Sequence, residues 1–226
     1  MSMSEHLRES VLGESAEAIL TSPSRTLTRG RQGPFRPRLA SRLACLERDD
    51  LERAAAGRHS VRRFTTDALP LPDVLSICGV ATEASELLVP PGDQGHRATW
   101  LVFASRVAGV EPALYAYEEG RLHRVAALPN AGAQAYAGQP ELVAAPCVLY
   151  PLWDLADAMA SDPTDGYLNV LTAAGSALYS AWLFALTLNV SGCLFRGMNP
   201  ALLPGPGPGG PAAHPVLALA LGHEAP

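Results

Sequence analysis

The chain contains no lysine. All 17 of its basic residues are arginines, and 22 acids outnumber them in a sequence of 226 residues. The arginines are concentrated at one end. Residues 1–63 carry 12 arginines and 8 acids (net +4), whereas residues 64–226 carry 5 arginines and 14 acids (net −9). The absence of lysine excludes a catalytic lysine, and the charge asymmetry sets the N-terminal region apart from the rest.

Cysteine and histidine are few and widely spaced. The four cysteines include no CxxC pair, and the six histidines show no spacing typical of metal ligands. These patterns argue against both a disulfide framework and structural zinc. Because no signal-peptide pattern opens the sequence, we expect a protein of the reducing cytoplasm.

Charge is also missing from residues 166–195, and within this stretch residues 167–190 are mostly apolar. A membrane-spanning helix needs about 20 apolar residues, so the length permits one. Polar residues such as Asn169, Thr172 and Ser180 dilute the apolarity, however, and no arginine cluster flanks the stretch. We therefore expect a central helix of a soluble protein, covered by its neighbours or by a partner subunit. Its small residues at 173–177 allow a backbone or a flat ligand to approach closely.

Residues 1–44 are predicted to be a partly disordered arm, because proline and glycine interrupt any regular structure there. An arginine-rich arm can contact nucleic acid or an acidic peptide, but a solvated leader is the simpler interpretation, and we expect no nucleic-acid partner. Residues 45–226 are predicted to form the folded domain, since 48% hydrophobic composition is ample for a core.

The octapeptide at residues 57–64, GRHSVRRF, follows a predicted helix directly. In an extended segment Arg58, Ser60 and Arg62 point to one face, where two guanidinium groups and a hydroxyl can meet one anion. A phosphate suits this arrangement. An exposed basic turn explains the same residues equally well.

This segment, followed by TTD and by a helix that opens on LPLPD, resembles the start of the flavin-dependent nitroreductase superfamily. In that superfamily an Arg-x-Ser-x-(Arg/Lys)-x-Phe motif holds the phosphate of FMN. The resemblance implies that Arg58, Ser60 and Arg62 bind this phosphate, with His59 beside them.

Two later segments resemble one branch of the superfamily, the thiazoline and oxazoline (azoline) dehydrogenases of peptide tailoring. The loop with Pro90, Pro91 and Gly92 stands where that branch has Pro-Ser-Gly-Gly, which implies a cofactor-binding role for Gly92. A predicted hairpin that turns at residues 119–120 matches the branch through its aromatic and glycine positions, Tyr115, Tyr117, Gly120 and Leu122.

The uncharged helix and the loop after it also follow the cadence of this branch. Arg196 and Gly197 lie in the segment whose backbone faces the flavin, so the resemblance implies that both bind the cofactor. The lysine of the branch has no counterpart here. Proton removal would then fall to Tyr167, to His96 or to solvent, and a purely structural role for Tyr167 at the helix start is the alternative.

The sequence thus predicts an α+β fold with a nitroreductase-like mixed β-sheet flanked by helices, in which the long central helix lies at a homodimer interface. The predicted function is FMN-dependent dehydrogenation of an azoline or similar group in peptide or natural-product biosynthesis. The substrate would be a peptide or small molecule, with a possible biosynthetic partner protein and no membrane. The alternatives are an NAD(P)H-dependent nitroreductase or ene-reductase, and a non-catalytic scaffold or peptide-binding subunit with a decayed flavin site.

Overall fold

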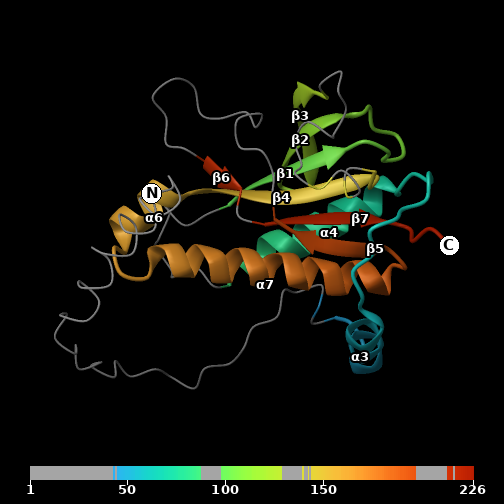
Figure 1. Cartoon of the computed structure of the whole chain (residues 1–226), viewed down its shortest axis with the longest axis horizontal. Coiled ribbons are helices and arrows are strands. Elements are labelled where there is room, and N and C mark those ends of the chain that lie inside the picture. The colour runs from blue at the N-terminus through green and yellow to red at the C-terminus, as the bar shows by residue number, and fades with distance from the viewer. Residues whose placement is uncertain are drawn as a thin grey trace, which may run out of the picture. The chain divides into compact units, whose positions relative to one another are not determined.

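The computed structural model describes residues 43, 45–87, 98–128, 139, 142, 144–196, 213–215 and 217–226. The predicted arm at residues 1–44 lies almost entirely outside this part, so its boundary stays a prediction. Figure 1 shows the arrangement of the helices and strands. The four described helices are α3 (Arg48–Gly57), α4 (Leu71–Glu86), α6 (Leu155–Ser161) and α7 (Gly166–Thr187).

Seven strands form one sheet in the order β3-β2-β1-β4-β7-β5, and the short strand β6 pairs with β4 outside this path. The strands are β1 (Thr99–Ala104), β2 (Ala113–Glu118), β3 (Arg121–Ala127), β4 (Cys147–Asp154), β5 (Ser191–Phe195), β6 (Ala213–Pro215) and β7 (Ala218–Gly222). The α+β class is confirmed.

The described strands pair antiparallel throughout, whereas a mixed sheet was predicted. Parallel pairing is limited, in the described chain, to the isolated bridge between Leu69 and Val107. The reason lies in the connections. β1, β2 and β3 follow one another as a meander, and β7 enters between β4 and β5 with the direction opposite to both. β4 and β5, which are connected through α6 and α7 and run parallel to each other, are separated by β7 and so do not pair.

The predicted hairpin is present between β2 and β3. Glu119 and Gly120 both have positive φ angles, 45° and 80°. Two successive residues of this kind fit a tight turn that matches the twist of the flanking strands. Glycine adopts this conformation without strain, so the glutamate–glycine pair fixes the place where the chain reverses.

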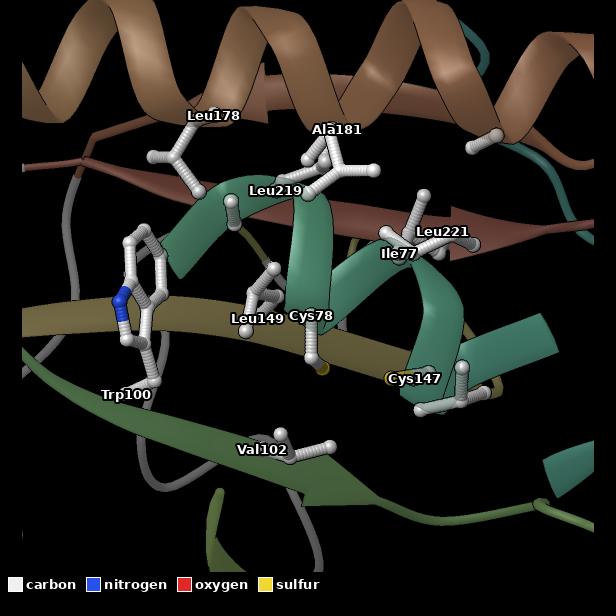
Figure 2. Packing of buried hydrophobic residues seen from close by; sticks show 14 of the residues in the cluster. Ile77, Cys78, Trp100, Val102, Cys147, Leu149, Leu178, Ala181, Leu219 and Leu221 are labelled. Atoms are coloured by element: carbon white, nitrogen blue, oxygen red, sulfur yellow. The ribbon is translucent and has the colours of Figure 1, made fainter. Parts of the chain in front are cut away.

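Helices α4 and α7 pack against each other and against one face of the sheet. Figure 2 shows the core that α4, α7 and the strands share, to which α4 contributes Ile77 and Cys78 and α7 contributes Leu178. The α4 sequence places its buried residues at helical spacing, from Val74 through Ile77 to Ala81 and Ala84. This periodicity gives α4 one apolar face, which the sheet and α7 cover.

Helix α7 corresponds to the long uncharged stretch. It is the one helix of the described residues that is long and apolar enough to cross a membrane, and half of its most apolar window is buried within the chain. Ala177, Leu178 and Ala181 are fully covered by the core that α4 and the sheet form, and Ala174 is fully covered in a second cluster with Trp153 of β4 and Ala158 of α6. The helix is therefore a core helix of this domain. Its outward face remains exposed and carries Leu168 (57% exposed) and Tyr179.

Both ends of α7 depend on backbone positions that suit their residues. A Cβ atom at Gly166 would collide with the backbone of Ala158 in α6, so only glycine allows the two helices to meet so closely. At the other end Asn189 has a φ of 59°, a left-handed conformation that asparagine tolerates and that commonly ends helices. The chain then returns directly as β5.

Candidate functional site

The predicted phosphate-binding segment is extended and lies between β5 and the C-terminal residues. The backbone N–H of Val61 donates to the carbonyl of Gly192 at 3.0 Å, and that of Thr65 donates to the carbonyl of His223 at 2.9 Å. Ala225 in turn donates to the carbonyl of Arg63 at 3.0 Å. These bonds hold the segment on two sides by backbone contacts alone, so they fix the direction of its side chains without using any of them.

Packing fixes the same segment from inside. Val61 is buried, and Phe64 is partly buried against the core on the sheet face opposite to α7. A Cβ atom at Gly222 would lie 2.7 Å from the Phe64 ring and 2.6 Å from Pro146, so glycine is needed where the ring crosses β7. Val61 is thus turned inward, while Ser60 and Arg62 on either side of it are exposed.

The guanidinium group of Arg58 stacks on two aromatic rings of α7. It lies 4.8 Å from the ring centroid of Trp182 and 5.8 Å from that of Tyr179, within the range of cation–π attraction. A stacked guanidinium group keeps its N–H donors in the plane, at the edge of the group. Among the described residues no carboxylate pairs with Arg58. The arginine is thus oriented by the rings and its donors are available to an anion.

His59 pairs with Glu224 instead of joining its neighbours. Its Nε2 atom lies 3.0 and 3.1 Å from the two carboxylate oxygens, and its Nδ1 atom lies 3.1 Å from the carbonyl of Gly57. The hydrogen bond with Glu224, followed by the contact with Gly57, raises the pKa of His59 above its ordinary value. A protonated His59 offsets the negative charge of Glu224, which would otherwise oppose a phosphate at this place.

The residues present fit a phosphate group. Ser60 is exposed, and its hydroxyl has no hydrogen-bond partner among the described residues, while Arg62, two positions further on, is also exposed. The buried indole N–H of Trp182 also has no acceptor in the described part of the chain. It borders Gly192, where a Cβ atom would lie 3.1 Å from that nitrogen. Cationic and neutral donors therefore gather here around the start of β5.

Two other predicted residues, Tyr167 and Arg196, are not brought to this place. Tyr167 is 47% exposed near the start of α7. Twelve positions separate it from Tyr179, which corresponds to about 18 Å along the helix. Arg196 is exposed directly after β5, and its carbonyl accepts a hydrogen bond of 3.2 Å from Gln139. Gly92, His96 and Gly197 lie outside the described residues, so their roles stay predictions.

The sequence did not predict that the rings of Tyr179 and Trp182 or the carboxylate of Glu224 would belong to this site. Tyr179 and Trp182 are spaced three apart in a helix rich in small residues, which is a detectable signal for a shared face. Glu224 gave no such signal. The Nδ1 atom of its neighbour His223 lies 3.2 Å from the carbonyl of Asn189.

Comparison with known proteins identifies the fold. No protein-family profile matches the sequence, and no curated protein matches it significantly. Among solved structures, a nitroreductase-like protein of Anabaena variabilis superposes with a TM-score of 0.62 at 18% identity. The match covers 78% of this chain, which spans only 38% of the length of that protein. A second one, from Ralstonia eutropha, gives a TM-score of 0.58 at 17% identity, covering 86% of this chain and 88% of that one.

A chain of the Escherichia coli microcin synthetase McbBCD complex, solved with truncated pro-MccB17 bound, is also similar. Its TM-score is 0.57 at 13% identity, and the match covers 94% of this chain and 82% of that one. The chain therefore has the fold of the nitroreductases, and the resemblance inferred from its motifs is confirmed at the level of the fold.

The His59–Glu224 pair makes a prediction about pH. Because the folded-state pKa of His59 is raised, the stability contributed by the pair is complete below about pH 6.5, the usual pKa of histidine. It is lost as the pH rises through the folded-state value. We expect an NMR titration of the His59 ring to give a pKa above 6.5, and Glu224→Gln to lower it. Glu111→Gln, at an exposed acid outside the segment, should leave it unchanged. Equal His59 pKa values in wild type and Glu224→Gln would contradict the pairing.

Proposed function

We propose that this protein is an FMN-dependent oxidoreductase whose segment 58–62 holds the phosphate of the cofactor. The observation that carries the proposal is the Arg58 guanidinium group stacked on Tyr179 and Trp182 with no carboxylate partner among the described residues. A cation that is held rigidly and is not neutralised suits a bound anion better than a solvated basic turn does. The same geometry on the nitroreductase fold supports a phosphate as that anion.

Arg58 and Arg62 supply charge and paired N–H donors for a dianionic phosphate, and Ser60 supplies a hydroxyl between them. Contact with Glu224 raises the pKa of His59, and the imidazolium form would balance that carboxylate. Bound FMN would supply two-electron redox chemistry, and the protein would orient it and exclude water from it. Gly92, Arg196 and Gly197 complete the proposed cofactor contacts.

Within this class we favour dehydrogenation of an azoline or similar group in a peptide or natural product. The β2–β3 hairpin carries Tyr115, Tyr117, Gly120 and Leu122 at the positions of the azoline branch, and the turn forms where that pattern requires it. The likeness to a microcin synthetase chain covers nearly the whole length of this one. This reading implies a peptide substrate and a biosynthetic partner protein.

An NAD(P)H-dependent nitroreductase or ene-reductase is the second candidate. It is favoured by the likeness to the Ralstonia eutropha protein, which extends over most of both chains. Reduction of bound flavin by NAD(P)H would support this candidate, because a reductase takes its electrons from NAD(P)H, whereas in a dehydrogenase the substrate itself reduces the flavin.

We further propose a homodimer in which the outward face of α7 contacts the same face of a second copy. This face carries Leu168, Thr172, Ser176 and Tyr179, and one chain leaves it exposed. In a two-fold contact with the helices antiparallel, the Tyr167 end of one α7 approaches the Arg58 end of the other. The arrangement would bring together two residues that a single chain keeps apart.

Cofactor binding tests the phosphate site directly. We expect Arg58→Ala and Arg62→Ala each to weaken FMN binding by about 1.5–3 kcal/mol, the range for hydrogen bonds that involve charged groups. Arg63→Ala is the matched control, since it removes the same charge from the other side of the same extended segment. Equilibrium titration measures all three. Unchanged affinity in both Arg58→Ala and Arg62→Ala would remove the segment from the cofactor site.

The dimer is tested on the outward face of α7. Ala177 and Ala181 are fully buried by their own chain, so a charge there would disturb the core and say nothing about a partner. Ser176 is exposed in a single chain. A charge introduced there by Ser176→Glu would lie in the proposed interface, so we expect analytical ultracentrifugation to show a monomer instead of a dimer. Ala156→Glu, on the exposed surface of α6, should leave the mass unchanged. A Ser176→Glu protein that stays dimeric would exclude this face as the interface.

Catalysis tests the assignment of the base. If the Tyr167 hydroxyl removes the substrate proton, Tyr167→Phe should slow azoline oxidation by roughly 10²–10⁴-fold, as expected for loss of a general base. His96→Ala tests the other candidate base in the same way, and the turnover of the two variants is compared at equal flavin occupancy. A loss below tenfold in both would leave the proton to solvent or substrate. A protein that binds FMN yet oxidises no azoline and reacts with NAD(P)H would be a reductase.

A further inference from the structure

Strand β3 forms an end of the sheet that the proposed function does not use. In the order β3-β2-β1-β4-β7-β5 it lies at the opposite end from β5, beside which segment 58–62 is held. Figure 1 shows β3 at the margin of the sheet. Among the described residues, β2 is the one segment that forms backbone hydrogen bonds with it. An antiparallel strand directs every second N–H and C=O pair away from its partner, so β3 offers these groups to another strand.

The first four residues of β3 are the regular part of this edge. Residues 121–124 pair with residues 115–118 of β2 without interruption, and the register shifts only after them, where Val125 has no partner. Four side chains of the strand are exposed in succession or nearly so: Arg121, His123, Arg124 and Val125. A regular stretch of this length is sufficient for pairing with a short added strand.

β3 is basic in an otherwise acidic region of the chain. Residues 64–226 carry 5 arginines and 14 acids, and two of those arginines, Arg121 and Arg124, lie on either side of His123 in this strand. Neither arginine forms an ion pair with a described residue. Glu118 lies opposite Arg121 across the hairpin and offsets its charge in part, whereas the uncharged Tyr115 lies opposite Arg124. The positive charge is therefore least compensated at Arg124.

We propose that β3 is a docking edge for an extended acidic peptide, which adds to the sheet as a further strand and places a carboxylate beside Arg124. Backbone hydrogen bonds provide the affinity of such strand addition, and side chains provide its specificity. The site shares no residue with segment 58–62, so it is independent of the flavin proposal.

Charge also decides between an acidic peptide and a second copy of this chain. If residues 121–124 of two copies were aligned antiparallel, Arg121 of each copy would lie opposite Arg124 of the other. Like charges placed directly opposite each other are destabilising, and charged edge strands avoid pairing with their own copies in this way. An acidic strand meets the same arginines favourably.

The test is fluorescence anisotropy of three dye-labelled hexapeptide amides with the full chain. Their sequences are Thr-Val-Glu-Glu-Val-Thr, Thr-Val-Gln-Gln-Val-Thr and Thr-Val-Lys-Lys-Val-Thr, and the adjacent glutamates place one carboxylate on the face of Arg124 in either register. We expect the glutamate peptide to bind at least tenfold more tightly than the other two. Arg121→Gln combined with Arg124→Gln should weaken it at least tenfold. The matched control, Arg48→Gln combined with Arg53→Gln, removes two exposed arginines of α3 and should change little.

Backbone methylation distinguishes strand addition from simple attraction to a basic surface. Methylating every second amide nitrogen of the glutamate peptide blocks the N–H groups along one edge of its strand, and the two possible isomers block opposite edges. We expect one isomer to lose at least tenfold in affinity and the other to bind nearly as well as the unmodified peptide. Equal affinity for both isomers and the unmodified peptide would overturn the proposal, because charge alone would then explain the binding.

Three other results would also overturn it. They are equal binding of the three hexapeptides, no binding of the glutamate peptide, and equal losses in the two double-glutamine variants. Hydrogen exchange without peptide tests the other occupant of the edge. Protection of the β3 amides that rises with protein concentration would contradict the proposal, because a second copy would then occupy the edge.

Discussion

The packing of α7 onto α4 and the sheet is the constraint on which the rest of this structure depends. Small residues such as Ala174, Ala177 and Ala181 let the helix approach its neighbours closely, and Leu178 fills the space toward the strands. Burial of one such leucine contributes about 1.5–3 kcal/mol. Once this face is packed, the positions of Tyr179 and Trp182 relative to the sheet are fixed. The end of α7 then determines where β5 begins.

From this arrangement the candidate site follows without any further element. Gly192, at the start of β5, accepts a hydrogen bond from Val61, and the C-terminal residues bond to the other side of the same segment. Arg58 is thereby brought over the α7 rings. The positive charge is held by packing and backbone bonds, so it needs no acid to position it. This explains how a chain without lysine can still present a cationic site.

Local features were predictable because they depend on neighbouring residues. The uncharged run predicted α7, and the glutamate–glycine pair predicted the hairpin turn, since periodicity and turn chemistry are read over short distances. Long-range choices were not. Nothing in residues 218–222 specifies that β7 lies between β4 and β5, and this insertion is what brings Glu224 to His59. The stacking of Arg58 on α7 likewise joins segments more than 120 positions apart.

The central claim is that residues 58–62 recognise a flavin through its phosphate. The most direct measurement is the affinity of the unmodified protein for FMN compared with riboflavin, which has the same ring and no phosphate. Two charge-assisted contacts of about 1.5–3 kcal/mol each correspond to a preference for FMN of roughly 10²–10⁴-fold. A preference of that size would support the account. Equal affinity for the two compounds, or no binding of either, would contradict it.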